Sequence, residues 1–101
     1  MGKGKDYSSA QYDGKTVVYS LNLEDGKKYV GMTNNFSQRM DQHFSGRGAK
    51  WTQAHAPQSI NHVQVCRTND TARQAERIVY TNMRNYHGKD NVRGAGHTKS
   101  T

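Results

Sequence analysis

The chain has 101 residues, 32% of them apolar, and fifteen Lys and Arg residues against eight Asp and Glu residues give it a formal net charge of +7. Its length predicts one domain with a small core, while its composition argues against a membrane-spanning helix, a secretory leader, an internal disulfide and a CxxC zinc site. We therefore expect a soluble, intracellular protein with no membrane or zinc partner, whose positive charge favours nucleic acid.

Sequence without periodicity is found at both ends of the chain. Residues 1–14 are rich in Gly, Lys, Ser and Tyr and predict a flexible basic arm. Residues 94–101 (GAGHTKST) predict a flexible tail. The folded domain is therefore expected over residues 15–93.

A β-hairpin is predicted first in this domain. The segments 16–23 (TVVYSLNL) and 27–33 (KKYVGMT) are rich in β-branched and aromatic residues, and Glu-Asp-Gly separates them. A three-residue turn with its glycine in the left-handed conformation would place Tyr19 and Tyr29 on one face, with Tyr19 opposite Gly31. A two-residue Asp-Gly turn would shift the pairing by one residue and separate the tyrosines. The sequence leaves both open, and we prefer the three-residue turn because it gives the tyrosines a common face.

An amphipathic helix is predicted next, running to about residue 44 and capped by Asn34 or Asn35. Its apolar stripe consists of Phe36, Met40 and Phe44. Arg39 and His43 are four positions apart, so they share one flank of this helix.

The rest of the chain predicts a short helix or turn over residues 49–55, a third strand over residues 59–68 and a long helix over residues 71–87. Asn69 or Asp70 would cap the long helix. The predicted fold class is α/β in the broad sense (α+β), with a small three-stranded antiparallel sheet flanked by helices.

Glu76 is the most informative single residue. It lies in the middle of the apolar stripe of the long helix, which also carries Ala72, Ala75, Val79 and Met83. A carboxylate on such a stripe loses solvation unless something compensates for it. An ion pair with Arg39, a bound metal ion, or a tilt toward solvent could each supply that compensation.

Taken together, these residues resemble the GIY-YIG nuclease superfamily. Val17-Val18-Tyr19 is similar to the first motif of the family and Tyr29-Val30-Gly31 to the second, with the two tyrosines ten positions apart. The other functional positions of the family match, in order, Arg39, His43, Glu76 and Asn91. The resemblance covers about residues 16–96. Val17 and Val18 replace the first motif's glycine and isoleucine, but only its tyrosine takes part in chemistry.

The resemblance implies a metal-dependent DNA endonuclease that hydrolyses a phosphodiester bond. Glu76 would hold one ion, Mg²⁺ or Mn²⁺, together with phosphate oxygens and waters. Tyr19 would be the general base, and a cation from Lys27, Lys28 or Arg39 would help it ionise, because an unperturbed tyrosine has a pKa of about 10.

The remaining catalytic positions are expected to act on the phosphate or on these two residues. Arg39 would grip the scissile phosphate, and His43 would orient Tyr19 or assist proton transfer. Tyr29 would position water or phosphate, and Asn91 would bind near the metal ion or brace Glu76.

DNA contacts outside the reaction centre are assigned to Gly31, which would leave space for water and phosphate, and to the basic residues Lys27, Lys28, Arg47, Lys50, Lys89 and Arg93. A catalytic domain with no separate reading domain predicts little sequence specificity, as in a nuclease of DNA repair, recombination or a mobile element (homing type), acting alone or with a targeting protein partner. The alternatives are a catalytically inactive nucleic-acid-binding module of the same fold, and a structural protein in which Arg39 and Glu76 only pair.

Overall fold

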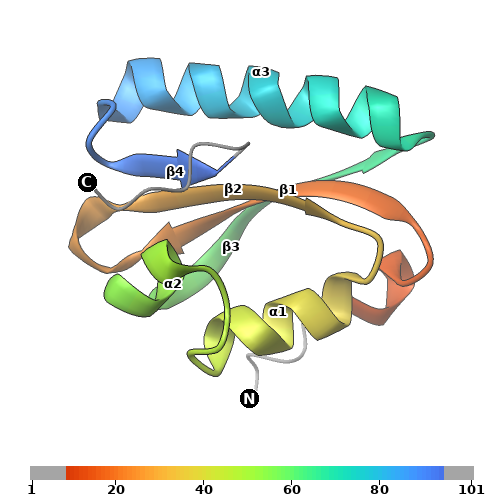
Figure 1. The fold of residues 1–101 in the computed structure, drawn as a ribbon, viewed down its shortest axis with the longest axis horizontal. Helices are drawn as coiled ribbons and strands as arrows, with labels where there is room; N and C mark the ends of the chain where they lie inside the picture. Colours follow the sequence, from red (N-terminus) through yellow and green to blue (C-terminus); the bar gives the residue numbers. More distant parts are fainter. Residues whose placement is uncertain (1–8, 95–101) are drawn as a thin grey trace.

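The computed structural model of the protein describes residues 9–94 (Figure 1). The predicted arm therefore lies outside the described residues over positions 1–8, and the predicted tail over positions 95–101. The elements, in chain order, are η2 (Ser9–Tyr12), β1 (Thr16–Leu23), η3 (Glu24–Gly26), β2 (Lys28–Thr33), α1 (Phe36–Phe44), α2 (Lys50–Ala54), β3 (Pro57–Cys66), α3 (Asn69–His87) and β4 (Val92–Gly94). None of the helices in this part of the chain is long and apolar enough to cross a membrane.

The sheet confirms the α+β class and has one strand more than expected. Its order is β3-β1-β2-β4, with β1 antiparallel to both β2 and β3 and with β4 parallel to β2. The three antiparallel strands were predicted, whereas no strand was predicted over Val92–Gly94, and Gly94 was assigned to the tail. Three residues are too few to show an alternating pattern, so the sequence carried no signal for this strand.

The hairpin register agrees with the three-residue turn. Tyr19 pairs with Gly31 and Leu21 with Tyr29. The turn itself needs a left-handed backbone at two positions, Asp25 (φ 64°) and Gly26 (φ 72°). Asp is one of the few residues other than glycine that adopts this conformation readily. The expected common face for the two tyrosines is therefore confirmed.

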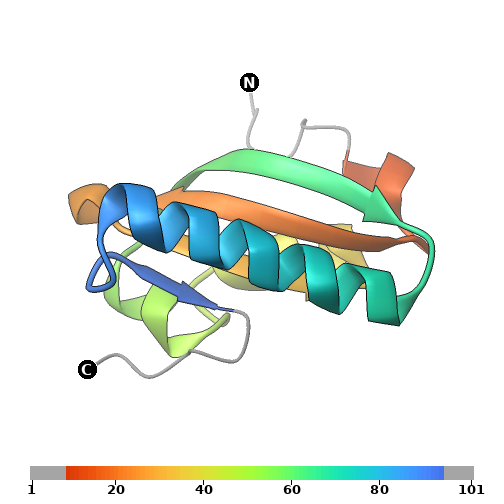
Figure 2. The ribbon, with the colours of Figure 1, turned by 90° about the horizontal axis from the view of Figure 1, so that it is seen from above.

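Helices cover both faces of the sheet, with α1 and α2 on one side and α3 on the other (Figure 1); Figure 2 views α3 and the sheet from above. Odd-numbered positions of β1 point toward α1 and α2, where Val17, Tyr19 and Leu21 pack with Phe36 and Met40. Even-numbered positions point the other way; Val18 packs with Val30, Val92, Ala72 and Tyr80. The two-residue period of a strand thus distributes the core between two layers.

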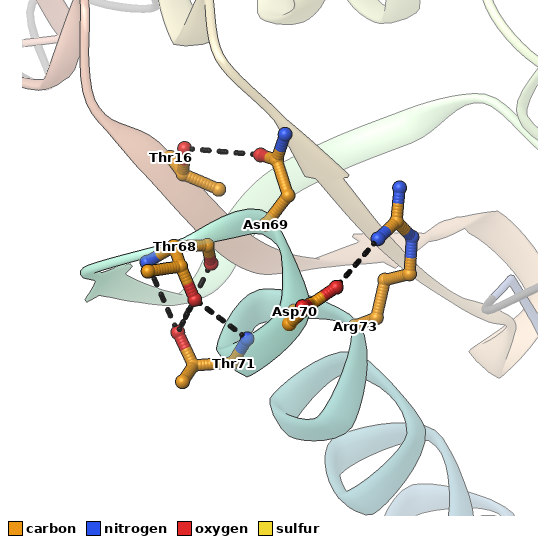
Figure 3. Close-up of polar contacts among 6 residues, drawn as sticks. All are labelled: Thr16, Thr68, Asn69, Asp70, Thr71 and Arg73. Atoms are coloured by element: carbon orange, nitrogen blue, oxygen red, sulfur yellow. Dashed lines mark hydrogen bonds and ion pairs between the residues drawn. The ribbon is translucent and has the colours of Figure 1, made fainter.

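The α3 helix begins one residue earlier than a cap at Asn69 would place it, and two residues earlier than a cap at Asp70. Thr68 is the N-cap, and its side chain and that of Thr71 each accept a hydrogen bond from the other's backbone amide (Figure 3). The predicted caps act differently: Asn69 contacts Thr16, and Asp70 pairs with Arg73 at 3.2 Å. A hydroxyl at position 68 satisfies the first free amides equally well, so the choice among three neighbouring polar residues was not visible in the sequence.

The segment just before β1 is packed against α1 instead of belonging to a free arm. The ring of Tyr12 meets Phe36 edge to face at 5.3 Å, and the carboxylate of Asp13 accepts hydrogen bonds from the amide and hydroxyl of Ser37. Asn35 caps α1, as one of the two predicted candidates. These contacts hold the first turn of α1, and therefore the flank that carries Arg39 and His43.

Candidate active site

Tyr19 and Tyr29 lie side by side on the face of the sheet that α1 and α2 cover, with ring centroids 6.3 Å apart. Gly31, opposite Tyr19, makes their close approach possible: a Cβ at Gly31 would lie 2.5 Å from the Tyr19 hydroxyl oxygen and 3.0 Å from Cε2 of Tyr29. We expected the space over Gly31 to receive water and phosphate. It is filled by the Tyr19 phenol, because the ring reaches across to the neighbouring strand.

His43 is fully buried and joins Tyr19 to the α1 layer. Its Nε2 lies 2.8 Å from the Tyr19 hydroxyl oxygen, and its Nδ1 lies 3.0 Å from Oγ1 of Thr52 in α2. The imidazole centroid is 5.0 Å from that of the Tyr29 ring. The expected contact between Tyr19 and His43 is therefore present, and Thr52 extends it into a three-residue chain.

The electrostatic environment of the two tyrosines does not favour the phenolate form. Burial raises the pKa of Tyr19, Tyr29 raises it further, and the Arg39 guanidinium opposes both without overcoming them. Burial also raises the pKa of Tyr29, again against Arg39. For Arg39, burial acts to lower the pKa, but the two tyrosines outweigh it and the pKa is raised. Both hydroxyls are therefore protonated and Arg39 is charged at neutral pH.

The imidazole of His43 is neutral at the same pH. Burial, and second the nearby Arg39 charge, lower its pKa to about 3. The groups that face it are Tyr19 from β1, Tyr29 from β2, Arg39 from α1 and Thr52 from α2. A neutral imidazole keeps one nitrogen lone pair, so it is able to accept a proton.

This buried histidine predicts a loss of stability in acid. In the unfolded chain it takes up a proton below pH about 6.5, whereas in the folded chain it stays neutral down to about pH 3. The unfolded state thus binds more protons in this window, and the free energy of unfolding falls as pH falls, by on the order of 3–5 kcal/mol across it. Urea unfolding at a series of pH values measures this slope. The slope should be shallower in His43→Gln and unchanged in the control His62→Gln, whose imidazole is exposed; equal slopes in all three proteins would contradict the pKa.

Glu76 approaches this group from the opposite layer. Asn69, at the start of α3, contacts Thr16, at the start of β1. About 10 Å along the strand from Thr16 lies Tyr19, and about 10 Å along the helix from Asn69 lies Glu76. Glu76 is half-buried, and its charge raises the pKa of both tyrosines. Glu76 on α3 is therefore within electrostatic reach of the tyrosine pair on the other face of the sheet.

Asn91 lies apart from this group. Its side-chain oxygen accepts a hydrogen bond from Nζ of Lys27 at 2.7 Å, and its amide donates to the carbonyl of His87 at 2.7 Å. His87 is about 16 Å beyond Glu76 along α3, which is more than a glutamate side chain reaches. The structure therefore places Asn91 as a support for the start of β2, and the suggested brace to Glu76 is absent.

Lys27 and Lys28 are also remote from the Tyr19 hydroxyl. Lys27 shares the tyrosine face but sits about 13 Å along β2 from Gly31, where its ammonium lies 6.0 Å from the centre of the Trp51 ring. Lys28 donates to Asn22 on the other face at 2.9 Å. Of Lys27, Lys28 and Arg39, the three cations expected to help Tyr19 ionise, Arg39 is the one that lies beside the tyrosines.

The other basic residues assigned to DNA are spread around the α2 side and the chain end. Arg93 stacks over Trp51 at 4.5 Å, and Lys50 is exposed at the first turn of α2. Arg47 is exposed and lies 3.9 Å from Asp41, and Lys89 is exposed in the turn after α3. Their side chains are accessible to a polyanion, but they lie away from the group formed by Tyr19, Tyr29, Arg39 and His43.

Two polar residues of the site were missed from the sequence. Gln42 accepts a hydrogen bond from Nη1 of Arg39 at 2.8 Å; the three-residue spacing on a helix was the available signal. Thr52 is buried against His43, and no sequence spacing links a residue in α2 to one in α1. Among residues 9–94, no three His, Cys, Asp or Glu side chains gather closely enough to hold a metal ion.

The chain is similar to curated bacterial proteins that carry the name UPF0213 protein. That of Bacillus cereus (strain ATCC 10987 / NRS 248) is 39% identical over 62 residues, which is 61% of this chain and 65% of the relative. That of Streptococcus pneumoniae serotype 4 is 34% identical over 66% of this chain and 68% of the relative. That of Nitratidesulfovibrio vulgaris is 50% identical over 40% of this chain and 36% of the relative. For the Bacillus relative, the matched region thus spans a little less than two thirds of its length.

No solved structure matches the chain. The family model described as the GIY-YIG catalytic domain matches residues 15–90, about three quarters of the sequence. That stretch contains the hairpin with both tyrosines, the flank of α1 with Arg39 and His43, and Glu76 on α3. The chain therefore belongs to the GIY-YIG catalytic domain family, and this membership implies a nuclease-type function.

Proposed function

We propose that the protein is a metal-dependent DNA endonuclease that hydrolyses a phosphodiester bond. The observation that carries the proposal is the convergence of two phenols, a guanidinium, a neutral imidazole and a carboxylate from β1, β2, α1 and α3. Phosphodiester hydrolysis needs an acceptor for the proton of the attacking water, a cation for the phosphate, and stabilisation of the leaving oxygen. The first two are supplied by these side chains.

The proton acceptor in this proposal is a pair of residues. The raised pKa of Tyr19 argues against a phenolate formed before reaction. Instead, the Tyr19 oxygen takes the proton of the attacking water while its own proton passes along the hydrogen bond to Nε2 of His43, whose two heavy atoms are 2.8 Å apart. Burial is the main cause of the lowered pKa of His43, and the Arg39 charge is the second; a negative phosphate bound at Arg39 partly cancels this second effect. Substrate binding therefore makes the imidazole a better proton acceptor.

Arg39 is the proposed phosphate ligand. Gln42 holds one of its Nη nitrogens, and both tyrosines interact with the guanidinium through charge and hydrogen bonding. A planar guanidinium with a fixed orientation suits the two free oxygens of a phosphodiester. Its position beside both hydroxyls would bring the phosphorus within reach of a water at Tyr19.

Glu76 is the residue that would hold a divalent ion. A single half-buried carboxylate fits a hard ion such as Mg²⁺ or Mn²⁺, which commonly takes one or two protein carboxylates and fills its other positions with substrate phosphate and water. When bound, the ion supplies Lewis-acid stabilisation of the negative charge on the phosphate and the leaving oxygen. The carboxylate contributes its position beside the tyrosines.

The proposed substrate is DNA cut with little sequence preference, as in repair, recombination or the movement of a mobile element. The basic side chains near Trp51 would contact phosphates away from the cut, a contact that carries no sequence information. A targeting protein partner inside the cell would then choose the site of cleavage. The names of the similar proteins state no activity, so the proposal that DNA is cut with little sequence preference is based on the GIY-YIG catalytic domain alone.

A plasmid assay tests the proposal. Purified protein incubated with supercoiled plasmid should nick it when Mg²⁺ or Mn²⁺ is present and should stop when a chelator removes the ion. Gel shifts at low salt on the same plasmid measure binding separately. A retarded but intact plasmid would favour the inactive binding module, and the absence of both nicking and binding would contradict any role in DNA.

A further inference from the structure

The position of Thr52 leads to an inference about the proposed reaction. We propose that Thr52 is a positioning residue that fixes His43 in the tautomer with hydrogen on Nδ1, so that Nε2 is the free acceptor facing Tyr19. The role in cleavage rests on the proposed nuclease function, whereas the tautomer itself follows from hydrogen-bond geometry. Thr52 was not among the residues expected from the sequence.

The direction of the hydrogen bonds that link Tyr19, His43 and Thr52 is fixed at Thr52. Oγ1 of Thr52 lies 2.8 Å from the carbonyl oxygen of Ala49. Two oxygen atoms at that distance repel each other unless a hydrogen lies between them, and a carbonyl has none to give. The hydroxyl of Thr52 must therefore donate its single hydrogen to Ala49.

The directions of the other two hydrogen bonds follow from that one assignment. With its hydrogen used, Oγ1 of Thr52 can only accept from Nδ1 of His43 at 3.0 Å, so Nδ1 carries a hydrogen. A neutral imidazole has one N–H, which leaves Nε2 with its lone pair. The hydroxyl of Tyr19 then donates to Nε2 at 2.8 Å. All three donors point away from the reacting water, which is the direction a proton must travel when Tyr19 acts as base.

Close packing keeps this arrangement free of competing partners. His43 is fully buried, and Thr52 is 1% exposed. Gly48 lies directly over their hydrogen bond: a Cβ there would overlap Nδ1 of His43 and would lie 3.0 Å from Oγ1 of Thr52. No room remains at Nδ1 for a substitute acceptor, so the preference of His43 for a hydrogen on Nδ1 depends on the threonine hydroxyl.

Nitrogen NMR of the His43 imidazole tests the tautomer without any use of activity. The intact protein, labelled with ¹⁵N at histidine, should show a protonated Nδ1 and an unprotonated Nε2 for His43 at neutral pH. In Thr52→Val, which has the same shape but no hydroxyl, the Nδ1 hydrogen would be buried without an acceptor. The hydrogen should therefore move to Nε2, and the two nitrogen shifts should exchange character.

Nicking of supercoiled plasmid supplies the functional half of the test. Thr52→Val should slow nicking at least ~10-fold because Nε2 no longer accepts the Tyr19 proton, whereas Thr52→Ser should stay within ~3-fold of the parent protein. Thr81→Val, the same change on α3, is the control. Thermal unfolding of each variant separates this effect from a loss of folding.

The outcomes distinguish the inference from the proposed function. A protonated Nε2 in the unsubstituted protein would overturn the proposed tautomer, whether or not plasmid is cut. This test does not depend on the folding of Thr52→Val. Normal nicking by a folded Thr52→Val protein would overturn the positioning role. A protein with the expected tautomer that never nicks plasmid would instead contradict the nuclease proposal.

Discussion

Replacing Tyr19 with phenylalanine is expected to slow plasmid nicking by ~10²- to 10⁴-fold, the usual contribution of a general acid or base. The change removes only the hydroxyl that links the attacking water to Nε2 of His43. The ring remains and keeps its edge contact with Phe36 at 5.9 Å. Plasmid binding should be unchanged, because Arg39 and the basic surface residues are untouched.

The control for this variant is Tyr86→Phe, because Tyr86 is 85% exposed on α3 and takes no part in the site. Tyr19→Phe should also unfold more easily, by about 1–3 kcal/mol, since Nε2 of His43 is left without a donor in a buried place. Nicking rates measured well below the unfolding transition separate the two effects. A Tyr19→Phe protein that nicks at the parent rate would remove Tyr19 from the reaction.

Glu76→Gln is expected to abolish measurable nicking, with a loss of ~10³-fold or more if the carboxylate holds the ion that stabilises the leaving oxygen. Glutamine has nearly the same size, so α3 should keep its packing, but a neutral amide binds hard divalent ions poorly. The measurement is nicking over a range of Mn²⁺ concentrations, together with gel shifts in the absence of metal.

The only other glutamate of the chain provides the matched control. Glu24 is exposed in the hairpin turn, and Glu24→Gln changes the net charge by the same amount without touching the site. DNA binding without metal should be equal to or slightly stronger than that of the parent in both variants, because each removes a negative charge. Nicking by Glu76→Gln at the parent rate would show that the carboxylate is dispensable.

The sequence predicted those parts of the site that depend on local periodicity. The alternation of β1 and β2, with a three-residue turn between them, was sufficient to place Tyr19 opposite Gly31. The four-residue spacing of Arg39 and His43 was sufficient to place them on one helix flank. These relations involve neighbours in one hairpin or one helix, so no knowledge of tertiary packing was needed.

The sequence failed where distance along an element or packing between elements decides the outcome. Lys27 shares a strand face with Tyr29, but face alone says nothing about the length of strand that separates it from the Tyr19 hydroxyl. Asn91 follows the helix of Glu76, yet α3 carries it more than two turns away. Thr52 meets His43 only through the tertiary packing of α2 and α1 on the same face of the sheet.

The short strand β4 has a consequence for how DNA-reading modules could be attached to this domain. It runs parallel to β2 and its last residue, Gly94, pairs with Val30, where the close approach of the two backbones leaves no space for a Cβ. The backbone at position 94 consequently stands one residue along β2 from Gly31, against which the Tyr19 phenol packs. A tether fused at that point would start beside the candidate site, so if the proposed cleavage occurs there, even a short linker could deliver a recognition module to the same stretch of duplex.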